Sequence, residues 1–234
     1  GLLTAAWLDA ASGSSKVFVR QFNGTAWVDL SAGSASGLGI STNDVLVGEF
    51  EIATSGENLA VAYTVENDGE GQIVVREYNG SSWTRISPAR GLGDVNYEST
   101  SPSLTYHDGQ LFVGWTQDMD GLRSGIQVRK FDGTLWSDVF SSVSGEAAEL
   151  AARPRLASNG GRLHLVWSGG QAEDFLVTGT SVYAAIWNGS TFVEEVAGDA
   201  SAGGVSLAGS AVSSLVLAVG TTGQPYLAWA DTGT

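Results

Sequence analysis

The chain contains no cysteine, one methionine and two histidines. Without cysteine it can form neither a disulfide nor a thiolate metal site, and two histidines alone do not favour a transition-metal site. No apolar run is long enough to span a bilayer, and no signal peptide is visible, although Gly1 is compatible with a removed leader. The lack of cysteine suits the cytosol and is also common among exported bacterial proteins.

Basic residues are scarce as well. The chain has 11 lysines and arginines but 25 aspartates and glutamates, which gives a net charge of −14. So acidic a surface does not suit the phosphate backbone of nucleic acid or an anionic lipid surface. Apolar residues make up 43% of the chain, which is enough for a core, and 32 glycines with eight tryptophans favour β-structure over helical bundles.

Two aromatic-containing patterns recur in register along the chain. The first is a turn motif at residues 23–27, 79–83, 132–136 and 188–192, whose glycines are separated by 56, 53 and 56 residues. The second is a series of strand-ending aromatic residues, separated by 56, 52, 52 and 62 residues: Trp7, Tyr63, Trp115, Trp167 and Trp229. Two patterns in register indicate a tandem repeat.

Each repeat is expected to hold four strands, here called a, b, c and d. Segment b alternates apolar residues, as in Leu59, Val61 and Tyr63, and segment c does the same at Ile73 and Val75. Four-stranded antiparallel units of about 40–60 residues are typical of propeller blades, whose inner strands are buried on both faces. We therefore predict an all-β fold, a β-propeller or propeller fragment of about five units with incomplete terminal blades. The units are 1–44, 45–98, 99–150, 151–205 and 206–234.

The chain begins within a b segment and ends just after another, so 17 strand segments are predicted rather than 20. A second chain or a further segment is expected to complete the propeller, because unpaired strand edges promote aggregation. An independent five-bladed ring with irregular ends is the alternative.

Turns join the strands in two ways. The dipeptide Asn-Gly or Asp-Gly between segments c and d predicts a type I′ hairpin, which needs positive φ at both central residues. The a–b turns, such as Asp108-Gly109, are also expected to be tight. The b–c and d–a connections are longer and more variable, with b–c loops predicted at 9–16, 66–72, 117–125 and 168–180. A functional site is expected on this b–c/d–a face, because variable loops on a rigid scaffold carry function.

The b–c connections are acidic, and two of them resemble half of a calcium-binding loop. Their carboxylates are Asp9, Glu66, Asp68, Glu70, Asp118, Asp120, Glu173 and Asp174. Asp68 with Glu70, and Asp118 with Asp120, are candidate Ca²⁺ ligands, because clustered oxygen atoms suit this cation. The alternative is a solvated hairpin loop without metal, since neither stretch has the distal glutamate of a complete site.

No catalytic residues are assigned. A nucleophilic serine needs a base, but the one near match to a nucleophile elbow, at residues 204–208, lacks its last glycine. His107 and His164 are expected to be structural. Paired carboxylates on the acidic face would suit glycoside hydrolysis. Arg20, Arg76 and Arg129 could suggest a sialidase-like cluster, but they share one slot of segment c, so pairing along the strands is expected instead.

The c–d element resembles a degenerate Asp-box, the Ser-x-Asp-x-Gly-x-x-Trp hairpin of sialidase-type propellers. Asn79, Gly80 and Trp83 keep the pattern, while the leading serine is absent. The whole unit also resembles repeats of exported bacterial surface proteins, at residues 102–104, Gly109, Trp115 and 131–136. This resemblance implies a propeller in an extracellular or cell-surface setting, often as a module of an adhesin or secreted enzyme.

The leading hypothesis is a non-enzymatic binding or adhesion module whose ligand is a glycan or a protein. Tyr97, Met119 and Phe175, with Asp174, are the candidate ligand contacts on the b–c/d–a face, because aromatic surfaces bind sugar rings and protein hot spots alike. The alternatives are a glycoside hydrolase, sialidase-like or other, that uses loop carboxylates, and a structural spacer. No cofactor is predicted other than calcium.

Overall fold

The computed structural model describes residues 2–10, 13–44, 46–67, 70–120, 123–142, 149–173, 176–201, 203–206 and 212–231. Its described elements are strands, β1 to β17. None of the described segments forms a helix that could cross a membrane. The chain divides into two compact units, Gly1–Thr100 and Ser101–Thr234, which are treated separately below.

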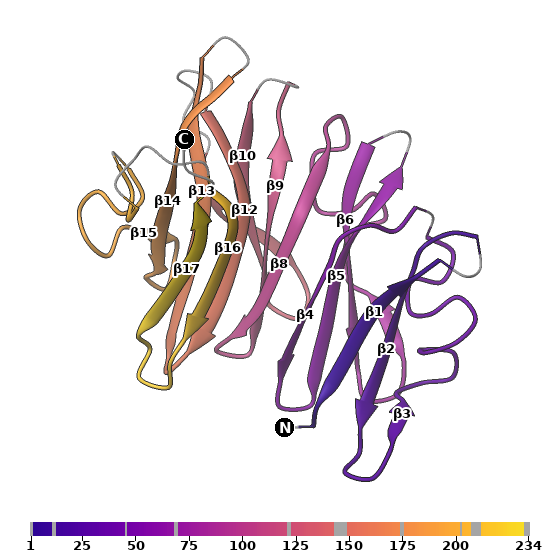
Figure 1. Cartoon of the computed structure of the whole chain (residues 1–234). Coiled ribbons are helices and arrows are strands. Elements are labelled where there is room, and N and C mark those ends of the chain that lie inside the picture. Colours follow the sequence, from indigo (N-terminus) through magenta and orange to yellow (C-terminus); the bar gives the residue numbers. More distant parts are fainter. Residues whose placement is uncertain are drawn as a thin grey trace. The chain divides into compact units, whose positions relative to one another are not determined.

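The first unit contains two antiparallel sheets (Figure 1). One has three strands: β1 (Thr4–Asp9), β2 (Lys16–Phe22) and β3 (Trp27–Asp29). The other has four strands: β4 (Phe50–Ser55), β5 (Asn58–Asn67), β6 (Glu70–Tyr78) and β7 (Trp83–Arg85). A single core cluster holds the two sheets together, with Val17 and Val19 of β2 packed among Leu59, Val61 and Tyr63 of β5.

The second unit contains two four-stranded blades and a two-stranded hairpin (Figure 1). The first blade is β8 (Ser99–His107), β9 (Gln110–Asp118), β10 (Ser124–Phe131) and β11 (Trp136–Ser141). The second is β12 (Glu149–Asn159), β13 (Arg162–Glu173), β14 (Leu176–Trp187) and β15 (Phe192–Val193). One parallel pair, Ser124 with Leu150, joins the two blades. The hairpin is β16 (Val212–Val219) and β17 (Pro225–Asp231).

This order reproduces the predicted sequence of strands: b-c-d, three times a-b-c-d, then a-b. The b strands of the complete blades are buried on both faces, as the continuous apolar pattern predicts. All residues from Leu59 to Tyr63 are at most 2% exposed, although side chains alternate between the two faces of a strand.

The b strand of the last sheet is covered less well. Its aromatic residue, Trp229, is 40% exposed, whereas Trp115 and Trp167 at the same repeat position are 2% and 4% exposed. Among the described residues, β16 and β17 form a two-stranded sheet. That a second chain or a further segment pairs with this sheet stays a prediction.

The c–d turns differ from the type I′ geometry expected from their Asn-Gly sequence. Positive φ occurs at the glycines, 100° at Gly24 and 91° at Gly80, but not at the preceding asparagines. Four residues separate β2 from β3, and Oδ1 of Asn23 accepts the main-chain N–H groups of Thr25 and Ala26, both at 2.9 Å. The side chain of the asparagine therefore organises the turn, in the manner of an Asx-turn.

Two-residue turns of the expected kind occur between segments a and b instead. Asp108 and Gly109 both have positive φ, 48° and 75°, and join β8 directly to β9. This combination is the one that a type I′ hairpin requires.

Two of the four predicted b–c loops, 66–72 and 168–180, are mostly paired strand, which corrects the prediction for these two connections. β5 and β6 continue their pairing outward until Asn67 faces Glu70. β13 and β14 reach Glu173 and Leu176, so most of the loop expected at 168–180 is a paired hairpin. Continued backbone pairing satisfies the N–H and C=O groups that a loop would leave to water.

The d–a connections are tied back to the c strand of their own blade by a repeated contact. In each of the four blades with a c strand, a main-chain N–H of the connection donates to the carbonyl of an apolar residue of that strand. The four donor–acceptor pairs are Ile40–Val17 (2.8 Å), Leu92–Ile73 (3.0 Å), Ser142–Ile126 (2.9 Å) and Val205–Val182 (2.8 Å). These bonds place the connections at fixed points on the b–c/d–a face.

Candidate functional site

A pocket of about 370 Å³ lies in the first unit, where β5 ends and β6 begins. Three segments form it: the connection before β4, the β5–β6 hairpin, and the segment that leads from β7 into β8. The lining residues are Leu46, Glu49, Thr64, Val65, Glu66, Gly71, Glu98, Ser99 and Thr100. The pocket belongs to the b–c and d–a connections, and thus to the face on which a ligand site is predicted.

Main-chain pairing positions Glu49 at the pocket. The N–H of Gly48 donates to the carbonyl of Thr64 at 3.0 Å, and the N–H of Thr64 donates to the carbonyl of Glu49 at 2.9 Å. A Cβ on Gly48 would lie 2.6 Å from Oγ1 of Thr64, so glycine permits this close approach. Glu49 follows directly, with its side chain exposed.

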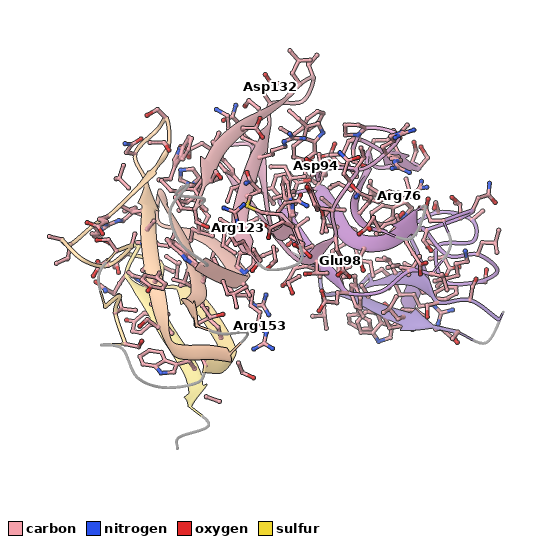
Figure 2. All side chains as sticks on the ribbon, turned by 90° about the horizontal axis from the view of Figure 1, so that it is seen from above. Arg76, Asp94, Glu98, Arg123, Asp132 and Arg153 are labelled. Carbon is pink, nitrogen blue, oxygen red and sulfur yellow. The ribbon has the colours of Figure 1, made fainter. Side chains whose placement is uncertain are left out.

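A second glycine makes room for Glu98. Gly71 lies opposite Glu66 in the β5–β6 pairing. A Cβ on Gly71 would lie 3.0 Å from the carbonyl of Ser99 and 3.1 Å from Cγ of Glu98. The aliphatic part of Glu98 therefore packs directly over the backbone of β6 (Glu98 is labelled in Figure 2).

The pocket is strongly acidic. Three of its lining residues are glutamates and three carry hydroxyl groups, while none of the described lining residues is basic. Carboxylates are acceptors of up to four hydrogen bonds, and hydroxyls both donate and accept. Such a surface suits a ligand that is rich in donors and repels anions.

Tyr97, one of the predicted ligand contacts, stands next to this pocket. Its side chain is 37% exposed, and it immediately precedes Glu98. The buried side chain of Gln72 holds the segment in place, because its Nε2 donates to the carbonyls of Asp94 at 2.9 Å and Tyr97 at 3.3 Å. The aromatic ring is thus carried by a segment that is fixed before any ligand arrives, which lowers the entropic cost of binding.

Met119, Asp118 and Asp120 form a closed turn in the second unit. The N–H of half-buried Met119 donates to the carbonyl of Arg123 at 3.0 Å. Oδ1 of Asp118 accepts the N–H of Asp120 at 3.1 Å, and Oδ2 of Asp120 forms an ion pair with Arg123 at 2.8 Å. These contacts hold the described residues of this connection together by hydrogen bonds and an ion pair.

Of the other predicted contacts and metal ligands, the structure describes Glu70 alone. Glu70 begins β6 and is half-buried, while Asp68, Asp174 and Phe175 lie outside the described residues. In the part of the chain that the structure describes, no three aspartates, glutamates or histidines are grouped so as to hold a metal ion. Calcium binding stays a prediction.

The serine of the near-match to a nucleophile elbow is structural. Oγ of Ser206 accepts the main-chain N–H of Val182 at 2.9 Å, next to the bond between Val205 and the carbonyl of Val182. The same arrangement occurs in the first unit, where Oγ of Ser41 accepts the N–H of Val17 at 3.1 Å. The Gly-x-Ser sequence at 204–206 is therefore an anchor of the d–a connection.

Both histidines connect neighbouring strands. Nδ1 of His107 lies 2.8 Å from Oγ of Ser158. Nε2 of His164 donates to the carbonyl of Gly223 at 3.1 Å, which ties β13 to the turn of the last hairpin. These contacts agree with the structural role expected for both residues.

Acidification is expected to weaken this tie at His164. The side chain is 4% exposed, and burial lowers its pKa below the usual value near 6.5. The unfolded chain then binds a proton at higher pH than the folded chain, so stability is complete above about pH 6.5 and falls as the pH drops toward the folded pKa.

The measurement is urea unfolding at pH 7.5 and 5.5 for the native protein and for His164→Gln, which keeps a donor for Gly223. The native protein should lose more stability between the two pH values than the variant. An equal loss in both would contradict the assignment.

Arg20 and Arg129 pair along the strands, as expected from their common slot in segment c. Arg20 faces Asp29 at 3.2 Å, and Nε of Arg129 lies 2.6 Å from Oδ1 of Asp138. Arg76 departs from this pattern and is considered further below. Arg20 and Arg129 are therefore paired with aspartates within their own sheets.

Glu49 and Glu98 were not identified from the sequence, whereas Glu66 belongs to the predicted acidic set. Both missed residues lie at the ends of d–a connections, just before strand a. Each follows or faces a glycine that the backbone approach requires, Gly48 or Gly71. Only the neighbouring Gly48 and Glu49 could have been noticed in the sequence, because Gly71 and Glu98 are distant along the chain and meet in the fold.

No protein-family model matches the chain, and no curated protein matches it. Solved structures do match. An endo-arabinase from Bacteroides thetaiotaomicron aligns with a TM-score of 0.52 and 10% identity, over 98% of this chain and 89% of the enzyme. A thermostable family-43 glycoside hydrolase aligns with a TM-score of 0.50 and 11% identity, over 98% and 84% of the two chains.

A sialidase from Trypanosoma rangeli aligns with a TM-score of 0.51 and 16% identity, over 83% of this chain and 36% of the sialidase. Together with the blades described above, these matches show an all-β fold of the β-propeller class. At such low identity they establish the fold alone.

Proposed function

We propose that the chain is a carbohydrate-binding module, and that the acidic pocket of the first unit binds a neutral sugar. The observation that carries the proposal is the pocket itself: Glu49, Glu66 and Glu98 around one cavity, with hydroxyl groups between them. Sugar hydroxyls are hydrogen-bond donors, and bonds to charged acceptors are stronger than neutral ones. The volume lies in the lower part of the range for small-molecule sites.

The surroundings of the pocket support a sugar over an anionic ligand. Tyr97 precedes the lining residue Glu98 in the chain, and its partly exposed aromatic side chain is of the kind that packs on sugar rings. The three carboxylates and the net charge of −14 oppose sugars that carry carboxylate or sulfate groups. A module of this kind would act at the cell surface or outside the cell, which remains part of the proposal.

A glycan array, run with and without calcium, tests the proposal and identifies the ligand. Neutral glycans should bind and sialylated or sulfated ones should not. Since a hydrogen bond to a charged group contributes about 1.5–3 kcal/mol, Glu98→Gln should weaken binding by about tenfold or more. Glu66→Gln should act in the same direction.

Glu57→Gln is the matched control, because it makes the same change of charge at the a–b turn, the other end of the same blade. Equal affinities for the native protein, E98Q and E57Q would refute the pocket as the site. If no glycan on the array bound, a structural spacer or a module that binds a protein ligand would be favoured.

Hydrolysis is the second candidate, because a pocket with three carboxylates can contain an acid and a nucleophile or base. Glycosidases hold such a pair at about 5–5.5 Å or about 6.5–9.5 Å. Release of reducing sugar from an array-positive glycan, abolished in E66Q or E98Q, would support it. Binding of a glycan without release of reducing sugar would favour the binding module over the hydrolase.

A further inference from the structure

The blade β4–β7 carries a charge pattern that its neighbours do not share. In the pairs β2–β3 and β10–β11, an arginine of strand c faces an aspartate of strand d: Arg20 with Asp29, and Arg129 with Asp138. In β6–β7 the same position holds two arginines, Arg76 opposite Arg85. Like charges directly opposite each other destabilise a sheet.

Asp44, from the connection before β4, lies between the two arginines. Its Oδ2 is 3.4 Å from Nη2 of Arg76, and its Oδ1 is 3.6 Å from Nη1 of Arg85. A third cation, Lys16, donates its ammonium to the main-chain carbonyl of Asp44. Two positive side chains thus contact the carboxylate of Asp44, and a third contacts its main-chain carbonyl.

Tyr63 does not supply the missing negative charge. Its hydroxyl donates to Oδ2 of Asp44 at 2.6 Å and accepts a bond from Nε of Arg76 at 2.8 Å. Burial raises the pKa of Tyr63 well above its usual range, so the phenol stays protonated. Arg76, Arg85 and Asp44 therefore hold one positive charge in excess, while Lys16 lies opposite Asp9 in the β1–β2 pairing.

This excess sits in partly buried surroundings. The side chains of Arg76, Asp44 and Arg85 are 12%, 15% and 25% exposed, and Lys16 is 4% exposed. Charges that are shielded from water are costly unless they are paired. These cations lie in a chain whose net charge is −14.

The guanidinium of Arg85 is fixed in position. Its Nε donates to Oγ of Ser87 at 3.2 Å, and its Nη2 donates to the carbonyls of Pro88 and Ala89 at 2.9 and 2.7 Å. Among the described residues, Nη1 has only the longer contact to Asp44. A rigid, partly exposed guanidinium suits an oxyanion, which it binds with little loss of entropy.

We propose that Arg85 and Arg76 bind a small oxyanion, with Lys16 and Asp44 setting the local charge. The ligand class is sulfate, phosphate or a carboxylate. The site is independent of the acidic pocket, because it uses none of the pocket's lining residues and recognises the opposite charge. It predicts that the protein carries both a neutral-sugar site and an anion site within its first unit.

The test measures Tm against millimolar sodium sulfate, with sodium chloride at matched ionic strength as the reference. The native protein should show a saturable rise of about 3–6 °C, because a ligand at ten times its Kd stabilises by RT ln 11. Arg85→Asp restores the arginine–aspartate pair of the other blades. This variant should lose the saturable rise while keeping a Tm in chloride no lower than that of the native protein.

Arg20→Ala controls for the loss of an arginine and should keep the sulfate response. Calorimetry with phosphate and glucuronate then distinguishes an inorganic from an organic anion, and glucose serves as the neutral reference. An equal sulfate response in native protein and R85D would overturn the proposal, since sulfate stabilises folded proteins in general. No saturable response in the native protein would overturn it as well.

If R85D fails to fold, calorimetry on the native protein and R20A decides, with absence of binding counting against the site. R85D should leave binding at the acidic pocket intact. The anion site and the sugar site can therefore be confirmed or refuted separately.

Discussion

Replacing Gly39 with alanine should lower the free energy of unfolding by about 3 kcal/mol, whereas the same change at Gly37 should cost about 1 kcal/mol. Both glycines lie in one connection and have almost the same φ, 58° and 60°. The left-handed backbone penalty for alanine is therefore the same. The difference comes from space: a Cβ on Gly39 would lie 2.1 Å from the carbonyl oxygen of Val17, but a Cβ on Gly37 meets nothing within 4 Å.

The carbonyl of Val17 cannot move away easily, because it accepts the N–H of Ile40 at 2.8 Å. The added methyl group would break this anchor or push apart the connection and β2. Urea unfolding of the two variants provides the comparison. If both alanine variants lost the same stability, backbone strain alone would explain why glycine is needed at position 39. The hydrogen bond between Ile40 and Val17 would then contribute nothing measurable to stability.

A second pair of glycines repeats the experiment in the other unit. Gly204 has φ of 62° and its Cβ would lie 2.3 Å from the carbonyl oxygen of Val182, while Gly198 has φ of 97° and open space around its Cβ. Gly204→Ala should therefore be the more damaging change. Agreement between the two units would show that the anchor belongs to the repeat.

Removing the carboxylate of Asp44 should cost about 3 kcal/mol, because it leaves three cations together in partly buried surroundings. Asp44→Asn keeps the shape of the side chain and a hydrogen-bond acceptor for Tyr63, so its effect isolates the charge. The matched control is Asp29→Asn, in the exposed pair with Arg20, where a loss of about 0.5 kcal/mol is expected.

Chemical unfolding at low and high salt separates the charge repulsion from the other effects of the substitution. The loss in D44N should shrink as salt screens the repulsion among the arginines. In the double variant D44N/R85D, one aspartate again neutralises the pair, so most of the stability should return. Equal small losses in D44N and D29N would contradict the buried charge cluster.

The architecture was accessible from the sequence because the repeat leaves two independent traces. The tight turn after strand c and the aromatic residue that ends strand b recur in register, and the alternating apolar residues between them are strands in the structure. Burial of Leu59 to Tyr63 on both faces follows from the same continuous apolar pattern. These properties are local and repeated, so each copy confirms the others.

The geometry of the c–d turns was not accessible in the same way. Asn-Gly suits a two-residue hairpin, but the side chain of Asn23 offers an alternative by accepting two main-chain N–H groups. The type I′ hairpin and the turn organised by the asparagine side chain differ by a few hydrogen bonds of similar energy. The strands that flank the turn, and the position of the aromatic residue after it, decide between them.

The pocket depends on residues that are distant in sequence. Glu49, Glu66 and Glu98 come from three segments, and their meeting requires close backbone contacts at Gly48 and Gly71. Strand patterns carry no information about such approaches. The paired arginines are different: the nine-residue spacing of Arg20 and Asp29 recurs at Arg129 and Asp138, so the exception at Arg85 was visible in the sequence once the strand register was considered.

The bond from each d–a connection back to its own c strand has an evolutionary consequence. Since a connection is fastened to the blade it has just left, its course is set by that blade before it reaches the next one. New recognition surfaces can thus arise one blade at a time, by mutation or by recombination of repeats, while the strands that carry them stay unchanged.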